Sequence, residues 1–418
     1  MNWIIFDTTS NPQKQMFWWP KSVGTVSALR TSQIKIAQLS HCLILLLTIV
    51  LSACSREISD SQTQSFIKFF GGGQNAEGFD MVEVPDGYIF AGFNTTTQFK
   101  KQVYVVKTDK AGNALWARQY GTAQADEAVV VKPFNDDIYL LCNSKNDITS
   151  LTTSYLLKLN SKGDSLTSFP FGEATYSLVL NDFLVDESSI YVVGESYQNS
   201  PTQSDYFFGR YDHLGSPVWE PKTFTSSGNQ VFSRAFHSSN GNIIAVGTNS
   251  AVIGSGYTHI AMVEFTSQGL PIYNVNLPSA ANYYFGDAFL HDNHLVIAYN
   301  TISQGNFTAE VVCVSASSYQ LVWQAEASID KEIKALTKGS DGTIAVFAEQ
   351  GAQIHLYQLN EQGHIILSND EVKSMLGYVE KAISTSDKGW AFIGTTAPDY
   401  GTMMQVVKTD ANLFLFEQ

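Results

Sequence analysis

Six polar side chains recur at a similar place in a repeated β-type segment, and they are the residues best placed to bind a ligand. Each precedes a small or acidic residue in segments that return about every 50 residues along the 418-residue chain. The six are Glu127, Asn181, Arg234, Asp287, Lys334 and Lys381, and the first segment has Phe79 instead. Polar groups inside apolar strands are costly unless they are solvated or paired. Two interpretations stay open, namely a ligand site and a solvated lining without a ligand.

Histidines and acidic residues offer a second candidate for chemistry. His291 and His294 flank Asp292 and Asn293, which are residue types found in metal sites. The same slot in other repeats holds turn residues such as Asp341-Gly342, so a turn is the favoured interpretation. The sequence contains no nucleophile elbow, phosphate loop, zincin motif or calcium loop. We therefore expect no catalytic residue, metal ion or cofactor.

Cysteine and tryptophan positions favour packing over chemistry. Cys142 stands where four other repeats have glycine, and Cys313 lies in the fifth repeat, so both are expected to be buried free thiols. Trp116, Trp219 and Trp323 share one repeat position. Packing between neighbouring repeats is the favoured role of these indoles, and stacking on a sugar is the alternative.

Seven copies of one motif must position all these residues. Each copy has a turn signal followed by a short apolar β-type run, and then a second strand that ends in another polar turn. The apolar runs are residues 87–92, 137–142, 189–194, 242–247, 294–299, 343–348 and 389–394. Four strands fit in each unit, and no interval has a convincing helical period. The pattern predicts an all-β chain.

Four-stranded units that repeat seven times favour a seven-bladed β-propeller over an open stack of hairpins. The strand-like segments at residues 65–70 and 413–416 predict that one of them closes the last blade. In such a ring Arg234, Lys334 and Lys381 would occupy one arc of the channel mouth, with Asp287 among them. That arrangement suits a zwitterionic or partly anionic ligand.

The N-terminal region has the features of a secretion signal. Arg30 and Lys35 precede an apolar run of about a dozen residues, which is too short to span a membrane and is typical of a secretory signal. The run ends in Leu51-Ser52-Ala53-Cys54, which resembles the lipobox of bacterial lipoproteins. The resemblance implies cleavage before Cys54 and lipidation of that residue. An ordinary cleaved signal or a short anchor helix is the alternative.

These features divide the chain into three parts. We expect residues 1–53 to form the signal peptide, residues 54–64 a lipidated tether and residues 65–418 the propeller. We also expect the true start of the protein to lie downstream of Met1. The segment 1–53 holds four basic residues and one acidic residue, so the mature chain carries a formal charge of −17. That surface disfavours nucleic acid and anionic lipid headgroups. The resemblance to bacterial lipoproteins also implies that Ser55, where an Asp would retain the protein in the inner membrane, permits delivery to the outer membrane.

The best-preserved repeat identifies a resemblance. Residues 86–92, 105–121 and 126–128 resemble predicted surface β-propeller lipoproteins and secreted repeat proteins of bacteria, and more distantly quinoprotein-like repeats. The resemblance implies a fold and no ligand. We expect a monomeric, lipid-anchored binding or scaffold module of the cell envelope or cell surface, with a protein or glycan partner. The alternatives are an envelope enzyme or carbohydrate-processing accessory with its site at the propeller mouth, and a component of outer-membrane assembly.

Overall fold

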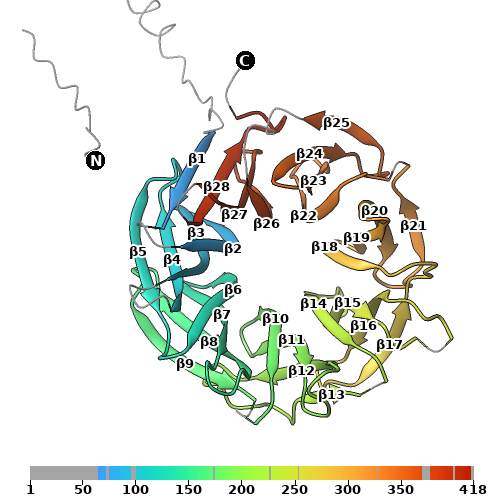
Figure 1. Cartoon of the computed structure of the whole chain (residues 1–418), viewed down its shortest axis with the longest axis horizontal. Helices are drawn as coiled ribbons and strands as arrows, with labels where there is room; N and C mark the ends of the chain where they lie inside the picture. The colour runs from blue at the N-terminus through green and yellow to red at the C-terminus, as the bar shows by residue number, and fades with distance from the viewer. Residues whose placement is uncertain are drawn as a thin grey trace, which may run out of the picture. The chain divides into compact units, whose positions relative to one another are not determined.

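A computed structural model describes residues 65–415, apart from 72–74, 96–99, 173–174, 226, 253, 327, 370–376 and 399–400. The signal peptide, Cys54 and the tether lie outside these residues. The chain divides into two units, and the second, residues 62–418, contains every strand described here. Its strands form seven four-stranded antiparallel sheets around an axis, which is a seven-bladed β-propeller as the repeats predicted (Figure 1).

Each of the first six blades is a continuous stretch of chain that runs from the innermost to the outermost strand. The first two blades are β2 (Ala76–Val84), β3 (Gly87–Thr95), β4 (Lys101–Thr108), β5 (Ala114–Tyr120), and β6 (Ala125–Phe134), β7 (Asp137–Lys145), β8 (Thr152–Asn160), β9 (Ser165–Phe171). The third and fourth are β10 (Leu178–Val185), β11 (Ile190–Ser196), β12 (Asp205–Tyr211), β13 (Lys222–Phe224), and β14 (Gln230–His237), β15 (Ile243–Asn249), β16 (His259–Phe265), β17 (Pro271–Asn276). The fifth and sixth are β18 (Tyr284–His291), β19 (His294–Ser303), β20 (Asn306–Ser315), β21 (Leu321–Gln324), and β22 (Glu332–Lys338), β23 (Ile344–Gln350), β24 (Gln353–Leu359), β25 (Ile365–Asn369).

The seventh blade joins the two ends of the propeller. It consists of β26 (Tyr378–Ser384), β27 (Trp390–Thr396), β28 (Met403–Thr409) and, outermost, β1 (Phe66–Phe70). Five register pairs run from Phe66↔Lys408 to Phe70↔Met404. Of the two terminal segments that could close the ring, the N-terminal one supplies the strand.

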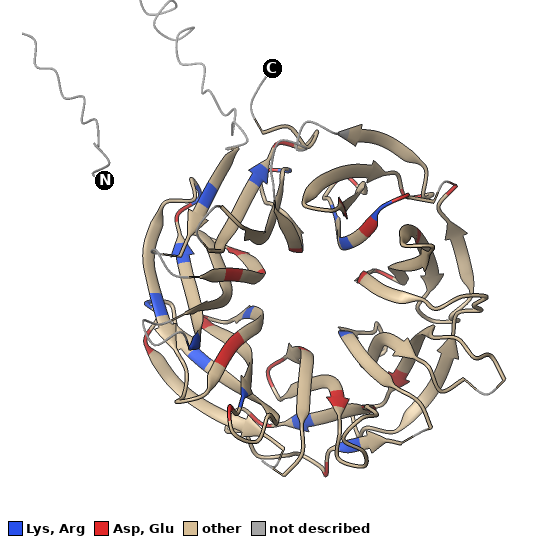
Figure 2. Ribbon diagram, viewed as in Figure 1, with Lys and Arg blue, Asp and Glu red and all other residues tan. Residues whose placement is uncertain are grey.

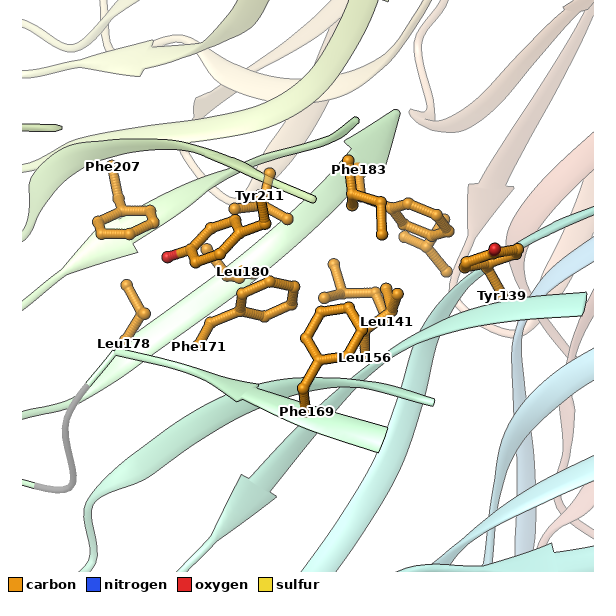
Figure 3. Close-up of a cluster of buried hydrophobic side chains, with 13 residues drawn as sticks. Tyr139, Leu141, Leu156, Phe169, Phe171, Leu178, Leu180, Phe183, Phe207 and Tyr211 are labelled. Carbon is orange, nitrogen blue, oxygen red and sulfur yellow. The ribbon is translucent and has the colours of Figure 1, made fainter. Parts of the chain in front are cut away.

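The hydrophobic core lies between the blades. Seven clusters of buried side chains each fill one interface between adjacent blades. Figure 3 shows the cluster between the second and third blades, where Phe171 meets Tyr211 with ring centroids 4.7 Å apart. Because second strands are buried on both faces, they read as unbroken apolar runs in the sequence.

The three repeated tryptophans pack between blades. Each indole covers the glycine in the turn between the third and fourth strands of the next blade. The pairs are Trp116 with Gly163, Trp219 with Gly269 and Trp323 with Gly363. Each of these glycines has a positive φ. This confirms packing as the shared role of the position.

A long polar side chain recurs in the third strand of six blades. It reaches the turn between the first two strands of its blade or a turn of the next blade, as Lys107 does with Asp86 at 2.8 Å and Lys408 with Asp387 at 2.8 Å. The equivalent residues are Lys107, Lys158, Arg210, Glu264, Gln358 and Lys408. In the fifth blade the position is Cys313, which pairs with Val296.

Candidate binding site in the channel

All seven innermost strands contain a β-bulge, and the bulge sets where each predicted site residue lies. The expectation that the six polar residues share one position is wrong, because the bulge changes the count along the strand. Asn181 and Lys334 are bulge residues themselves. Arg234, Asp287 and Lys381 follow the bulge directly, and Glu127 lies two residues before it.

Only the three residues that follow a bulge come together. Arg234 Nε lies 2.8 Å from Asp287 Oδ1, and Lys381 Nζ lies 3.3 Å from Asp287 Oδ2. The Asp287 side chain is fully buried, and each cation is about one quarter exposed, at 23 %. One carboxylate therefore holds two cations from different blades, so the charge of the predicted basic arc is partly neutralised.

The other three predicted residues have local partners. Glu127 pairs with Lys101 of the first blade at 3.0 Å, and Lys334 pairs with Glu332 at 2.7 Å. The Asn181 amide donates to the Phe232 carbonyl of the fourth blade at 2.9 Å. These side chains stabilise the lining of the channel at other levels, and they do not meet the Arg234 network.

Two aspartates missed in the sequence complete the inner ring. Asp80 and Asp182 occupy the same position after the bulge as Asp287. Each of the three carboxylates accepts a hydrogen bond from a backbone amide of the next blade: Asp80 from Val131 at 2.8 Å, Asp182 from Ala235 at 2.9 Å, and Asp287 from Leu336 at 3.2 Å. They join the first, third and fifth blades to the blades that follow.

A third cation belongs to this ring. Lys132 Nζ lies 2.7 Å from Asp182 Oδ1 and also donates to the Phe183 carbonyl. Three carboxylates and three cations, Lys132, Arg234 and Lys381, thus line the middle of the channel. Figure 2 shows acidic and basic residues on the strands around the axis.

Burial and charge act differently on the buried carboxylates. Burial, the largest effect, raises the pKa of Asp80, and the charges of Lys381 and Arg234 only partly offset it. At Asp287 burial also acts to raise the pKa, but the positive Arg234 and Lys381 outweigh it and bring the pKa below its ordinary value. Asp287 is the ionised centre of the network.

A cavity of about 360 Å³ lies over this ring. Its floor includes Asp80, Asp182, Arg234 and Lys381. Its walls come from the last residues of the innermost strands and are mostly apolar, with Leu184, Phe236, His237, Phe289 and Leu290 among them. The volume lies within the usual range of about 300–1,000 Å³ for small-molecule sites, and apolar walls around a few polar groups are typical of them.

The opposite end of the channel is acidic. Glu77 and Glu380 both have raised pKa values, chiefly because burial disfavours their ionised forms. Burial also raises the pKa of Glu349 to about 7. A carboxylate oxygen of Glu349 accepts a hydrogen bond from the Val379 amide of the seventh blade. The two ends of the channel therefore differ in charge.

The histidines and cysteines singled out in the sequence lie outside the channel ring. Asp292 and Asn293 form the turn between β18 and β19, and His291 and His294 are register partners beside it. Among the residues that the structure describes, no group of three or more His, Cys, Asp or Glu side chains could hold a metal ion. Cys142 and Cys313 are buried free thiols, as expected. The described part of the chain includes no helix with the length and apolarity to cross a membrane.

Comparison with known proteins supports the fold and goes no further. No protein-family model matches the chain, and no curated protein matches it. Among solved structures, one similar structure is the β-propeller domain of the Trilobed protease from Pyrococcus furiosus, which is described as having an open velcro topology. It aligns with a TM-score of 0.50 and 10% identity, over 83% of this chain and 97% of that one. A puromycin-hydrolysing peptidase of Mycobacterium tuberculosis gives a TM-score of 0.53 and 11% identity over 84% of this chain and 52% of that one.

A third similar structure, YCF48 bound to D1 peptide, gives a TM-score of 0.51 and 10% identity over 84% of this chain and 96% of that one. At these identities the likeness shows the propeller fold alone. The class of the protein is thus a seven-bladed β-propeller whose seventh blade is closed by its N-terminal strand.

Proposed function

We propose that this chain is a lipoprotein of the bacterial cell envelope, anchored through Cys54, whose propeller is a non-catalytic binding module. The observation that carries the binding role is the cavity over the channel ring, where charged groups form the floor and apolar side chains form the walls. The anchor rests on Leu51-Ser52-Ala53-Cys54 after an apolar run of signal length. The propeller then displays its cavity at the membrane surface.

The charges of the ring beneath the cavity support a zwitterionic ligand. Asp80, Asp182 and Asp287 balance Lys132, Arg234 and Lys381 in number, so a ligand with one net charge gains little from the ring as a whole. A ligand with separated positive and negative groups can face a cation and a carboxylate at once. The three carboxylates are buried, which strengthens such contacts relative to those on the surface.

The chain enters the propeller on the same face as the cavity. Ser65 Oγ lies 3.5 Å from the Phe414 carbonyl, just after the last turn of the seventh blade. The Phe66 ring packs against Gly112, in a turn between the third and fourth strands of the first blade. These turns lie at the end where the innermost strands finish, which is also where the cavity walls lie.

Binding is tested with detergent-solubilised full-length protein and three matched sets of small molecules. The sets are free amino acids, their amides as cations, and their N-acetyl derivatives as anions. We expect a free amino acid at about ten times its Kd to stabilise the fold by about 1.4 kcal/mol, with the amides and acetyl derivatives ineffective. His237→Trp, at the exposed rim of the cavity, should abolish the shift, whereas His364→Trp on an outer turn should keep it.

A cavity role is overturned if no free amino acid shifts the melting temperature, or if His237→Trp leaves the shift intact. The anchor is tested separately with radiolabelled palmitate. Cys54→Ser should remain an unprocessed precursor without label, and equal labelling of variant and parent would refute the lipoprotein assignment. The two tests are independent, so either half of the proposal can fail alone.

A further inference from the structure

One blade departs from the rule that a long polar side chain fills the third-strand position. In the other six blades this side chain reaches a turn or the strand residue next to one, as in the Lys158–Asp137 pair at 2.7 Å. Cys313 has the same register and is 1% exposed, but its side chain is too short to reach a turn. Burial raises the pKa of its thiol to about 11, so the thiol stays protonated and presents a weakly polar surface.

A cavity of about 410 Å³ lies beside Cys313, between the fifth and sixth blades. Its apolar lining includes Phe289, Val296, Trp323 and Ile344. Three features singled out in the sequence line this one cavity: the thiol of Cys313, the indole of Trp323 and the histidines beside the β18–β19 turn. It shares only Phe289 with the channel cavity and is a separate site.

The polar side of the cavity both donates and accepts hydrogen bonds. His291 and His294 contribute imidazoles, Glu361 a carboxylate, Lys338 an ammonium group and Gln362 an amide. Lys338 lies 3.2 Å from Glu361, and the His291 imidazole lies 3.4 Å from the Asp292 carboxylate. No single sign of charge is available to hold an ion, whereas a neutral ligand with many hydroxyl groups would find partners of both kinds.

We propose that this cavity binds a neutral sugar. A sugar ring has an apolar face of C–H groups that suits an aromatic and aliphatic wall, and a rim of hydroxyls that both donate and accept. Trp323 and Ile344 form the wall, and the imidazoles, Glu361 and Gln362 form the rim. The site exists because Cys313 stands where other blades place a side chain long enough to fill the space.

The test measures binding of neutral monosaccharides and disaccharides of glucose, galactose, mannose and N-acetylglucosamine to the full-length protein in detergent. Glucuronic acid serves as the charged comparison. Cys313→Lys restores the residue found at this position in three other blades and should fill the cavity. The matched control is Gln358→Lys, the same position in the sixth blade.

We expect at least one neutral saccharide to bind saturably, with at least a tenfold loss of affinity in Cys313→Lys and unchanged affinity in Gln358→Lys. Two rim variants at exposed positions, His294→Ala and Gln362→Ala, provide the same test if Cys313→Lys does not fold, and each should weaken binding at least threefold. The proposal is overturned if no neutral saccharide binds, if glucuronic acid binds better, or if the cavity and rim variants keep the affinity of the parent. The amino-acid panel addresses the channel cavity, so failure of one site does not imply failure of the other.

Discussion

The indole of Trp219 covers Gly269 so closely that a Cβ on the glycine would lie 2.7 Å from the ring, and the indole N–H donates to the Ser267 carbonyl at 3.0 Å. The third blade thereby holds the turn of the fourth, where Gly269 has a φ of +75°. Gly241 has a similar φ of +82°, but no atom lies within 4 Å of its Cβ position.

This pair of glycines separates packing from backbone strain. Gly241→Ala should cost only the strain of a left-handed residue, about 1 kcal/mol. Gly269→Ala should cost that strain plus the displacement of a packed indole, about 3 kcal/mol in total. Urea unfolding measures both, and equal losses of stability would show that the indole contact contributes nothing.

Closure of the ring predicts unequal effects of two deletions near the N-terminus. Removal of residues 65–70 strips β1 from β28 and exposes an unpaired strand edge. Because Phe66 and its neighbours also leave the core, we expect the melting temperature to fall by at least about 5 °C. Removal of residues 55–62, outside the propeller strands, is the control and should shift it by less than about 2 °C. Thermal unfolding of both variants checks the role of the seam.

Arg234 and Lys334 should respond differently to truncation, although the sequence placed them at one position. Arg234→Ala leaves the fully buried Asp287 with Lys381 alone, and we expect a loss of about 3–5 kcal/mol of stability. Lys334 is 33 % exposed and pairs with a neighbour on its own strand, so Lys334→Ala should cost less than about 1 kcal/mol. Denaturant unfolding compares them, and similar losses would contradict the ring.

Glu349 should make stability fall as pH rises. Its pKa is about 7 in the folded protein against an ordinary 4.5, so the folded state holds the proton more tightly than the unfolded state. Its stabilising contribution is complete below pH 4.5 and is lost as the pH rises through 7. Glu349→Gln keeps an oxygen for the Val379 amide and removes the ionisation.

The free energy of unfolding of Glu349→Gln, relative to that of the parent, should therefore rise by up to about 3 kcal/mol between pH 4.5 and pH 8. Exposed Glu187→Gln is the control and should follow the parent at every pH. Unfolding free energies measured across this range provide the check, and a constant difference between Glu349→Gln and the parent would refute the raised pKa.

The sequence predicted the repeat well because the apolar second strands and their turns leave a strong signal. The seven runs, the turn at Asp292 and the packing of Trp116, Trp219 and Trp323 all follow from residues at a fixed spacing. For the strand that closes the seventh blade, the sequence left two candidates, residues 65–70 and 413–416, because both ends of the chain have strand-like residues. Only the observed pairing of β1 with β28 decides between them.

The channel ring was harder to predict because a β-bulge adds one residue without a sequence signature. An alignment on the small residue before each apolar run joined Arg234 to Lys334, which lie at different levels. Asp80 and Asp182, which directly follow Phe79 and Asn181, were therefore not aligned with Asp287. An alignment counted back from the second-strand position of Gly92, Gly194 and Tyr299 would have brought them into line with Asp287.

The seam between β1 and β28 also sets the order in which the molecule can be assembled. Ser65 and Phe414, which meet at this seam, are 349 residues apart in the chain. A ribosome makes β1 before any other strand and β28 after all the rest, so β1 has no native partner during nearly the whole of synthesis. Blades one to six can form from local hairpins, whereas the seventh needs the longest loop closure in the protein, a step that is intrinsically slow. A chain that lacks only its last strand would hold six finished blades, with β1 left without its partner and β27 left with an unpaired edge.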